Sequence, residues 1–452
     1  MKIIVAGCGK IGTTIIASLS QEGHDIVALD ISQAALDEIS NVYDVMCVCG
    51  PSTDCDVLQE AGVGEAKLFV CTTGSDEINM LSSFLAKKMG AQNTISRIRD
   101  PHYNDKSLSF VKQNLDLNVS INPEFMVARE LYNILRFPSA VNIETFSARQ
   151  FEMIELRLKE DSAFAGLSLS EIRKKYPGNY LIGTVVRDEE VIIPDGNFVV
   201  ESLDKIGLTA SPFEIQKLVK KLGLFQRQAK SVMILGASTT AHYLAKALLA
   251  GGHTVKIIEK DIEKCRKISD ELPNAIVICG DGAQQELLME EGISSTDAFV
   301  SLTGIDEENI LISIFASSQG VPKVITKVNR PELASMASKL GLDTVVSPKK
   351  VVSELITRHA RAIQNSLGSN VERLYKLCDG KAEALEFKVK EDFEYQNIPL
   401  KDMKIKKNAL VAGIIRHKRP FIPSGDDCFM NGDRVIILST GHQMDDLADI
   451  IR

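Results

Sequence analysis

The sequence predicts an α/β fold made of two tandem parallel-sheet domains, each followed by a small α+β domain. Three observations support this prediction. The chain opens on a buried strand, a glycine turn and a helix; the pattern returns about 230 residues later; and each copy closes with shorter strand and hairpin patterns. The first part of each copy is therefore predicted to be Rossmann-like, because such sheets begin with a buried strand that enters a helix through glycines.

The opening stretch predicts strand, turn and helix in that order. Residues 2–6 are an apolar run without alternation, which is typical of a strand buried on both faces. Gly7, Gly9 and Gly12 follow as a G-x-G-x-x-G turn, and a helix is predicted over residues 10–22. In a dinucleotide site the first glycine permits the turn, the second lets a pyrophosphate approach the backbone, and the third lets the helix pack on the strand.

A second predicted strand, residues 26–29, leads to Asp30, which lies eighteen residues after Gly12. A carboxylate at this place can accept hydrogen bonds from ribose hydroxyls. Because a carboxylate repels a 2′-phosphate, Asp30 favours NAD over NADP, and it leaves ATP and ADP open, since their ribose carries the same two hydroxyls. The alternative is a glycine turn in an ordinary α/β protein whose crevice binds nothing.

Composition narrows the class of protein. At 452 residues the chain has room for several domains, and 44% hydrophobic with 25% charged residues is ordinary for a soluble globular protein. The net charge of −8 argues against a nucleic-acid binder that uses a basic face. No apolar run approaches the length of a bilayer, and no signal-peptide pattern precedes the first strand. We therefore expect a cytoplasmic protein without a transmembrane segment of its own.

The nine cysteines agree with that compartment, because they are odd in number, scattered, and often placed in apolar runs. The alternative for Cys47 and Cys49 is a thiol pair for metal or redox chemistry. Their C-x-C spacing differs from C-x-x-C, and no second pair accompanies it. We predict no metal site.

Three more strands complete the predicted first sheet, at residues 45–48, 68–71 and 95–98, with a helix over 54–61. Thr73 and Gly74 follow the fourth strand, whose carboxyl end faces the crevice where ligands bind in parallel sheets. Asp76 and Glu77 open the next helix, where acids suit the positive end of the dipole, and we prefer that role to a metal site. Arg97 in the fifth strand either reaches the phosphates or the partner subunit, or pairs with a surface acid.

A helix predicted over residues 123–135, with its counterpart over 348–363, carries a continuous apolar stripe. Such a helix serves an interface or packs back on its own domain. The small part that follows is predicted as a compact α+β module that pairs with itself or holds a small effector. Its predicted pieces are a linker at 138–146, a strand at 151–158, a helix at 168–176, a hairpin of 181–186 with 191–193, a strand at 204–209, and a solvated connecting helix at 217–230.

The second half repeats the first in register. Gly236 matches Gly7 and Glu259 matches Asp30; after one slipped residue the pairs are Gly50/Gly280, Gly62/Gly292, Thr73/Thr303, Asn79/Asn309 and Arg97/Lys327. IIPDG at 192–196 returns as FIPSG at 421–425, and Asp204 returns as Asp433. An acid, glycines and a threonine kept in register indicate a duplication. We predict nucleotide-binding domains at 1–122 and 231–347 and small domains at 140–225 and 368–452.

The two copies differ at the glycine turn. Ser238 stands at the place of Gly9 and Ala241 at that of Gly12. A side chain at the second glycine position crowds a pyrophosphate, whereas Glu259 can still bind a ribose. We expect full nucleotide affinity in the first half and altered or absent affinity in the second. Conversely, Asp281 follows the third strand only in the second copy, where the first copy has Pro51.

No group of residues predicts catalysis. The seven histidines, at positions 24, 102, 242, 253, 359, 417 and 442, form no H-x-x-x-H or H-E-x-x-H pair. A dehydrogenase needs a proton donor or acceptor beside the nicotinamide and usually a substrate domain, and the small parts show no convergence of His, Lys and acid. Two nucleotide folds without a substrate domain predict a sensor rather than an enzyme.

The GCGKIG turn with Asp30, the TTGSDEIN segment, the SRIRDP segment at 96–101 and the IIPDG hairpin resemble the TrkA family of potassium-uptake regulators. The resemblance covers essentially the whole chain, and the tandem form is its most specific feature. It implies two modules that regulate the conductance of potassium (RCK modules), each with a nucleotide part and a C-terminal part. It also implies a homo-oligomeric ring at the inner face of the membrane that binds NAD(H) and adenine nucleotides and gates a Trk-type potassium channel or transporter.

The resemblance also implies binding residues. The first nucleotide site would consist of Gly7, Cys8, Gly9, Lys10, Ile11, Asp30, Thr73, Gly74 and Arg97, and second-site residues would be Ser238, Glu259, Thr303 and Lys327. Two rivals remain. One is an NAD-dependent oxidoreductase, and the other is an NADH-sensing transcription regulator, against which the net charge and the lack of a basic recognition helix weigh.

Overall fold

The computed structural model describes residues 1–100, 103, 105–136, 140–146, 150–160, 162–221, 229–365, 371–441, 444 and 446–451. The chain divides into two compact units. The first contains Met1–Tyr132, Ser231–Gly320 and Ile325–Ile363, and the second contains Asn133–Lys230, Val321–Val324 and Gln364–Arg452. None of the described helices is long and apolar enough to cross a membrane.

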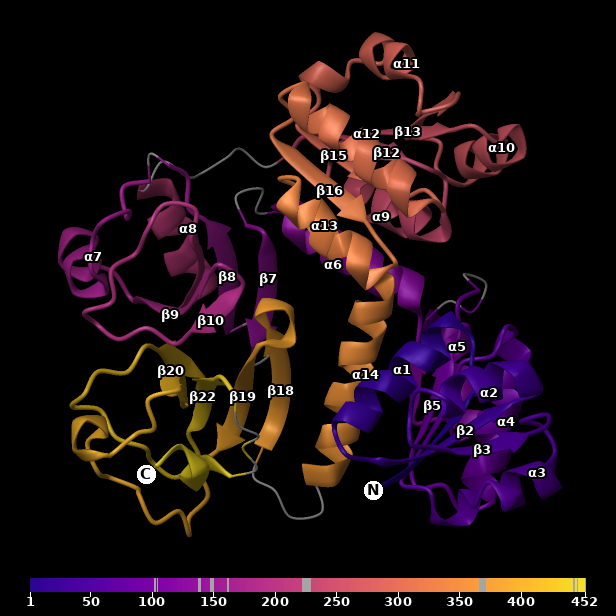
Figure 1. Cartoon of the computed structure of the whole chain (residues 1–452), viewed down its shortest axis with the longest axis horizontal. Coiled ribbons are helices and arrows are strands. Elements are labelled where there is room, and N and C mark those ends of the chain that lie inside the picture. The colour runs from indigo at the N-terminus through magenta and orange to yellow at the C-terminus, as the bar shows by residue number, and fades with distance from the viewer. Residues whose placement is uncertain are drawn as a thin grey trace. The chain divides into compact units, whose positions relative to one another are not determined.

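The first Rossmann-like domain has a six-stranded sheet in the order β3-β2-β1-β4-β5-β6, and all its pairings are parallel (Figure 1). Its strands are β1 (Lys2–Ala6), β2 (Asp25–Asp30), β3 (Met46–Cys49), β4 (Leu68–Cys71), β5 (Thr94–Arg97) and β6 (Val119–Ile121). Its helices are α1 (Lys10–Gln21), α2 (Gln33–Ser40), α3 (Cys55–Glu60), α4 (Asp76–Lys88), α5 (Asp105–Asn114) and α6 (Pro123–Arg136).

The second Rossmann-like domain repeats that order as β14-β13-β12-β15-β16-β17. Its strands are β12 (Ser231–Leu235), β13 (Thr254–Glu259), β14 (Ile276–Cys279), β15 (Ala298–Ser301), β16 (Lys323–Lys327) and β17 (Val345–Val346). Its helices are α9 (Thr239–Ala250), α10 (Ile262–Glu271), α11 (Gln285–Glu290), α12 (Asp306–Ser318), α13 (Pro331–Lys339) and α14 (Pro348–Asn365). The predicted fold class and the predicted duplication are confirmed.

The first sheet is covered on both faces, as its unbroken apolar strands predict. Ile3 and Val5 of β1 belong to one buried cluster, and Ile4 and Ala6 belong to another on the opposite face. This alternation follows from the two-residue period of a strand. In open parallel sheets covered on both faces, ligands bind at the carboxyl ends of the strands.

The sixth strand and helices α2 and α5 were not among the predicted elements. β6 has only three residues, Val119–Ile121, which is too short for a recognisable period. Helix α2 begins at Gln33, where Ser32 caps it by accepting a hydrogen bond from the N–H of Ala35 at 3.4 Å. A serine before a helix is a usable start signal that the sequence prediction missed.

Helices α6 and α14 connect the two Rossmann-like domains within their unit. Val352, Ile356 and Ala360 of α14 lie in the same core cluster as Ile16 and Leu19 of α1, and Figure 1 shows α14 in orange beside α1 in indigo.

Polar contacts extend this packing. Ser353 is hydrogen-bonded to Ser18, and Arg361 forms a salt bridge with Glu22.

Helix α6 reaches the second domain instead. The ring of Phe125 meets that of Tyr243 on α9 edge-on at 5.5 Å, and Asn122 donates a hydrogen bond to the Tyr243 hydroxyl at 3.2 Å. Each helix that follows a sheet thus contacts the other copy. The interface interpretation is confirmed for the apolar stripe of α14 within this unit, and for the stripe of α6 it stays a prediction.

The stability of the folded protein is expected to depend on pH through the carboxyl of Glu130 on α6. Burial, followed by the charge of Glu354 on α14, raises the pKa of the Glu130 carboxyl to about 7 from its usual value of 4.5. The fold favours the protonated carboxyl, so the stability this group contributes is complete below about pH 4.5 and is lost as the pH rises through 7. Glu130→Gln should therefore stabilise the protein at pH 8 by on the order of 1 kcal/mol, and by less at pH 5.

Thermal unfolding at the two pH values measures this difference. The exposed Glu60→Gln, in the same unit, is the control. An equal shift of the unfolding temperature at pH 5 and pH 8 for Glu130→Gln would contradict the assignment.

The two small domains are antiparallel sheets in the other unit, in the orders β10-β9-β11-β8-β7 and β18-β19-β22-β20-β21. The first contains β7 (Asn142–Phe146), β8 (Phe151–Arg157), α7 (Leu169–Lys175), β9 (Tyr180–Arg187), β10 (Glu190–Ile192), β11 (Lys205–Ala210) and α8 (Pro212–Lys221). The second contains β18 (Val371–Leu377), β19 (Ala382–Lys388), β20 (Ala409–Arg416), β21 (Arg419–Phe421), β22 (Arg434–Ser439) and the short helix η6 (Leu447–Ile450).

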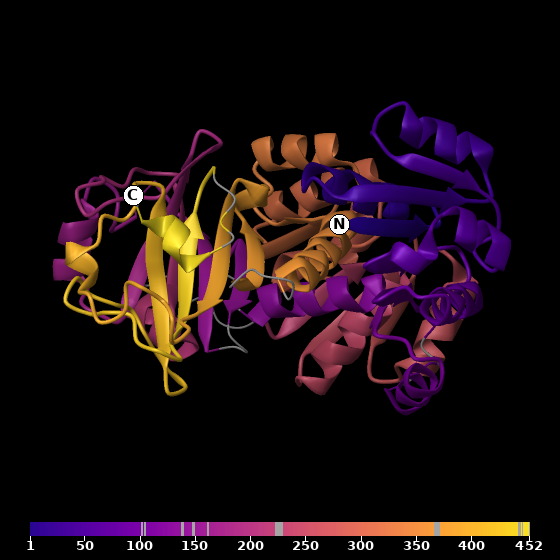
Figure 2. The same cartoon turned by 90° about the horizontal axis from the view of Figure 1, so that it is seen from below.

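The small domains pair with each other through a shared apolar cluster that includes Phe146 and Phe151 from one and Tyr375 from the other. Figure 1 shows the first, in magenta, beside the second, in yellow, and in Figure 2 the yellow domain lies in front of the magenta one. Repeat-related glycines make room for this contact. A Cβ at Gly183 would lie 2.3 Å from Leu438, and one at Gly413 would lie 2.9 Å from the ring of Phe151. The prediction that the module pairs with itself is confirmed within the chain.

The repeated aspartates of the small domains have a structural role. Asp204 is buried and accepts hydrogen bonds from Arg187 at 2.9 and 2.7 Å, and Asp433 accepts from Arg416 at 3.0 and 2.8 Å. Burying an unpaired carboxylate would destabilise the fold, and the two hydrogen bonds from each guanidinium compensate for that loss.

Two predictions for the first small domain are wrong. Residues 142–146 of the predicted linker form β7, which pairs with β8, while its first predicted residue, Pro138, is not among the described residues. The predicted solvated helix at 217–230 begins earlier, as α8, and buries Ile215 and Leu218 in the domain core. Residues 222–228, with Arg227, are outside the described part of the chain. The bounds of the four predicted domains stay a prediction.

Candidate functional site

The first glycine turn lies against the loop that follows β4. Gly7 has a φ of +91°, and a Cβ there would lie 2.6 Å from the amide nitrogen of Thr73. A Cβ at Gly12 would lie 1.9 Å from the carbonyl oxygen of Gly7. Both positions exclude a side chain, so two loops from neighbouring strand ends meet closely, at the edge where open parallel sheets bind ligands.

Gly9 differs, because the fold itself does not require a glycine there. Its φ of −72° and ψ of −171° suit any residue, and a Cβ would meet nothing within 4 Å. Gly9 is the N-cap of α1, and no side chain caps the helix. The first N–H groups of α1 therefore point, uncapped, toward open space beside the positive end of the helix dipole, which suits phosphate.

Asp30 ends β2 and faces the same turn. Its two carboxylate oxygens accept hydrogen bonds from the N–H of Cys8 at 2.6 Å and the N–H of Ser32 at 2.8 Å. A carboxylate has about four lone-pair positions, so ribose hydroxyls can still bind to it. The exposed side chain of Ile31 follows, 76% accessible, and provides an apolar surface next to this carboxylate.

The other turn residues contribute unequally. The Cys8 thiol is buried, donates to the carbonyl of Leu29 at 3.7 Å, and has a pKa raised to about 12, chiefly by burial. Its backbone takes part in the turn, through the N–H that donates to Asp30 and the carbonyl that accepts from the Thr13 hydroxyl at 3.1 Å, whereas its thiol is buried against the Leu29 carbonyl. Lys10 is exposed and Ile11 is half-buried in the first turn of α1.

Thr73 is held by an asparagine that the sequence prediction did not assign to the site. Asn79 Oδ1 accepts from the N–H of Thr73 at 2.8 Å and from its hydroxyl at 2.7 Å. Asn79 Nδ2 donates to the carbonyls of Thr73 at 3.3 Å and Arg97 at 2.9 Å. This side chain therefore ties together the strand ends of β4 and β5. Its only signal in the sequence is its place in the repeat register.

Asp76 has a larger role than the predicted helix start. Its carboxylate accepts from the N–H groups of Arg99 and Asp100, both at 2.8 Å, while the Arg99 guanidinium donates to the carbonyl of Gly74 at 2.8 Å. A Cβ at Gly74 would meet nothing within 4 Å, so the crevice side of this loop is open.

Arg97 lies half-buried at the end of β5. Its Nε is buried without a hydrogen-bond partner among the described residues, and burial, followed by the charge of Arg99, lowers the pKa of the guanidinium. A desolvated cation with a free donor gains from an anion. This arrangement favours the phosphate interpretation of Arg97 over a surface ion pair.

The second crevice repeats the acid and the asparagine. Glu259 accepts from the N–H of Ala237 at 2.7 Å and of Asp261 at 2.9 Å. Asn309 accepts from the N–H of Thr303 at 3.0 Å and donates to the carbonyl of Lys327 at 3.0 Å. The residues repeated in the second half therefore make the same hydrogen bonds as their counterparts Asp30 and Asn79 in the first half.

The helix start of the second crevice is different. Ser238 has nearly the backbone of Gly9, with φ of −75° and ψ of 164°, and its hydroxyl accepts a hydrogen bond from the N–H of Ala241 at 3.3 Å. One phosphate-binding donor is thus already used. Lys327 donates to the carbonyl of Leu302 at 3.4 Å, and burial lowers its pKa. Lys260 replaces the apolar Ile31 after the acid.

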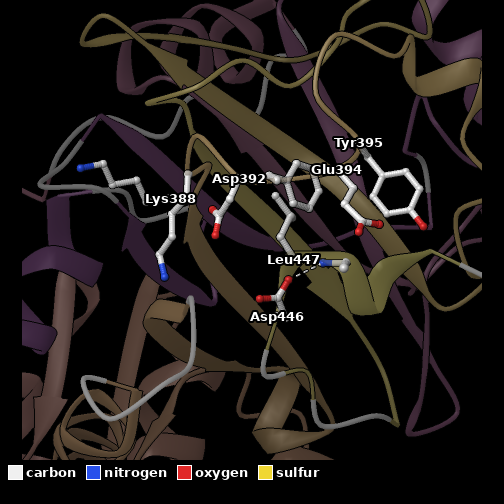
Figure 3. A pocket seen from close by; sticks show the side chains of 9 residues that line it. Lys388, Asp392, Glu394, Tyr395, Asp446 and Leu447 are labelled. Carbon is white, nitrogen blue, oxygen red and sulfur yellow. Dashed lines mark hydrogen bonds between the residues drawn. The ribbon is translucent and has the colours of Figure 1, made fainter.

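Two other features lie away from the crevices. A cavity of about 190 Å³ in the second small domain is lined by Lys388, Lys390, Asp392, Phe393, Glu394, Tyr395, Asp446, Leu447 and Ala448 (Figure 3). Asp446 accepts from the N–H of Ala448 at 2.8 Å, and charges of both signs surround the opening.

Over the described ranges, no group of three or more His, Cys, Asp or Glu side chains could hold a metal ion.

Comparisons with known proteins agree with the tandem architecture. A family model described as the TrkA-N domain matches residues 3–113 and 232–348, and one described as the TrkA-C domain matches 153–223 and 384–452. The chain is 30% identical over 454 residues to the Trk system potassium uptake protein TrkA homolog of Archaeoglobus fulgidus, covering 100% of both chains. It is 28% identical to the Trk system potassium uptake protein TrkA of Vibrio alginolyticus, over 98% of this chain and 94% of that one.

Solved structures show the same fold. The GsuK RCK domain covers 97% of this chain and 92% of its own, with a TM-score of 0.64 and 16% identity. The GsuK channel bound to NAD covers 97% of this chain and 76% of its own, with a TM-score of 0.63 and 16% identity.

Proposed function

The chain belongs to the TrkA family, and on that premise we propose that it is a regulatory subunit that binds NAD(H) or an adenine nucleotide and controls a Trk-type membrane potassium channel or transporter. The family members it resembles are named as potassium uptake proteins. We further propose that it acts as a homo-oligomer at the inner face of the membrane. It would change shape on binding and leave the nucleotide chemically intact.

The observation that carries this proposal is the uncapped start of α1 beside Asp30. Uncapped N–H donors at the start of α1, the Asp30 carboxylate at the end of β2, and the desolvated guanidinium of Arg97 provide groups for both phosphates and a ribose. The proposed first site consists of Gly7, the Cys8 backbone, Gly9, Lys10, Ile11, Asp30, Thr73, Gly74 and Arg97. Ser238, Glu259, Thr303 and Lys327 form a proposed weaker second site.

Helix α1 offers a direct mechanical route from the nucleotide. Its N-terminus would hold the phosphates, and its last turns hold Ser353 and Arg361 of α14 through Ser18 and Glu22. A twelve-residue helix is about 18 Å long and stiff, so a displacement at its start moves its end. A nucleotide would shift the assembly only by its difference in affinity for the two arrangements.

Potassium flux tests the function. The chain and the membrane potassium transporter with which it co-purifies would be placed in vesicles, and flux measured with NAD, NADH, ATP, ADP or no nucleotide. We expect flux to depend on nucleotide only when the chain is present. The proposal would be refuted if no nucleotide changed either the potassium flux or the subunit arrangement. Substrate-dependent NADH oxidation would favour the oxidoreductase alternative, and a DNA mobility shift would favour the transcription regulator.

Replacing Asp30 tests the ribose assignment. In the native protein NAD should bind more tightly than NADP, because the carboxylate repels a 2′-phosphate. Asp30→Ser should weaken NAD about tenfold or more, since a charge-assisted hydrogen bond is worth roughly 1.5–3 kcal/mol, and should narrow the preference over NADP. Isothermal titration calorimetry measures both, with Glu259→Gln in the second crevice as the matched control. Equal binding of NAD and NADP to the native protein would contradict the assignment.

A further inference from the structure

Two thiols lie at the same strand end beside the second crevice. Cys265 of α10 is 5% exposed and donates a hydrogen bond to the carbonyl oxygen of Glu259 at 3.2 Å. Cys279 is the last residue of β14, is exposed, and is the register partner of Glu259 in the parallel ladder. Both sulfur atoms therefore lie beside the strand end that carries the ribose-type acid.

Both thiols neighbour the Glu259 backbone, Cys265 through its hydrogen bond and Cys279 through its register in the ladder. Burial, followed by the influence of the nearby Cys279 thiol, raises the pKa of Cys265 to about 11, so Cys265 keeps its proton at neutral pH. Cys279 is the thiol that solvent can reach.

The first copy lacks this arrangement. Leu36 stands on α2 where the second copy has Cys265, and Cys49 stands in the place of Cys279. Cys49 donates to the carbonyl of Ile31 at 3.8 Å. The other two thiols on this side of the first sheet, Cys8 and Cys47, donate to different carbonyls, those of Leu29 and Leu36. The first copy therefore provides a matched single thiol at an equivalent strand end.

We propose that Cys265 and Cys279 form an oxidisable dithiol, which a hydroperoxide converts to an intramolecular disulfide at the edge of the second crevice. The disulfide itself does not depend on the proposed function. Its effect on nucleotide binding rests on that function.

The reaction has two balanced steps. The Cys279 sulfur, as thiolate, attacks an oxygen of the hydroperoxide; the O–O bond breaks, the second oxygen leaves and takes a proton as water or alcohol, and Cys279 becomes a sulfenic acid. The Cys265 sulfur then attacks the Cys279 sulfur and gives up its proton; the S–S bond forms, the S–O bond breaks, and water leaves. Two thiols lose two electrons and the peroxide gains them.

The disulfide would change the strand end that carries Glu259. Once oxidised, Cys265 no longer donates to the Glu259 carbonyl, which also accepts from the N–H of Gly280 at 2.9 Å. A covalent link between α10 and β14 would also fix the loop that begins at Gly280. The oxidation state of the pair would thus set the shape of this side of the crevice.

Peptide mapping tests the disulfide without any nucleotide. The reduced full-length protein would be treated with hydrogen peroxide, alkylated and cleaved after glutamate, which places Cys265 in residues 264–271 and Cys279 in residues 272–286. We expect these two peptides to be joined, to have lost two hydrogens, and to separate with dithiothreitol. Cys49→Ala, the matched control, should leave the link unchanged, whereas Cys265→Ala should leave Cys279 as a sulfenic acid that dimedone traps.

Two outcomes would overturn the proposal: oxidation of Cys279 in the native protein without the link, or a preferred link between Cys8 and Cys47. Should Cys265→Ala not fold, the native protein still provides a test. Phenylarsine oxide, which bridges neighbouring thiols, should protect Cys265 and Cys279 together from alkylation, and unprotected thiols there would count against the pair. NAD titration of the oxidised and reduced protein then tests the consequence separately, because a mapped link with unchanged binding would reject only the effect on nucleotide.

Discussion

Gly9→Ser is expected to weaken nucleotide binding at the first crevice roughly tenfold to a hundredfold and to leave the folded protein equally stable or slightly more stable. The backbone at Gly9 already has the conformation that Ser238 adopts in the second copy. The new hydroxyl would cap α1, which stabilises the helix by a few tenths of a kcal/mol over glycine. The same hydroxyl would take an N–H that a phosphate needs and would occupy its space.

The reciprocal Ser238→Gly is the matched variant. It should lose a few tenths of a kcal/mol of helix stability and increase nucleotide affinity in the second crevice. Calorimetric titration with NAD, NADH, ATP and ADP measures affinity, and thermal unfolding measures stability. The interpretation of Gly9 would be wrong if Gly9→Ser bound nucleotide normally, or if it lost binding only because the protein unfolded.

Asn79→Ala should cost the first Rossmann-like domain roughly 3–5 kcal/mol and abolish nucleotide binding there, because two backbone carbonyls and one N–H lose their buried partner. Asn79 is fully buried and makes four hydrogen bonds, three to Thr73 and one to the carbonyl of Arg97. Without them, the loop after β4 and the end of β5 are no longer fixed relative to each other.

Hydrogen–deuterium exchange locates the effect in a chain of several domains. Faster exchange is expected around Thr73 and Arg97, with the second domain unchanged. Asn309→Ala should speed exchange around Thr303 and Lys327 and leave the first domain unchanged, because Asn309 makes the corresponding contacts in the second domain. First-site affinity should survive Asn309→Ala. If both variants reduced binding at the first crevice equally, the asparagine would not be acting locally.

Local sequence predicted those parts of the site whose chemistry depends on neighbours in the chain. The strand 2–6, the turn at Gly7 and the acid at Asp30 lie within one strand–helix–strand unit, where backbone sterics and apolar period leave few alternatives. The crevice role of Asn79 was missed, because it depends on contacts with Arg97, eighteen residues further along the chain. The strand over 142–146 was missed because its pairing partner and its packing surface are supplied by other parts of the small domains.

The sequence by itself determined the duplicated α/β architecture, the glycine turn, the acid of each copy and the asymmetry between Gly9 and Ser238, since repeat register and residue size are properties of the chain alone. Only the tertiary structure decided which groups are free. It showed that the N-terminus of α1 has no side-chain cap, that the Arg97 Nε is buried without a partner among the described residues, and that Cys265 and Cys279 both lie beside the Glu259 strand end. The physical reason is that hydrogen bonding and desolvation depend on distances between atoms that are remote in sequence.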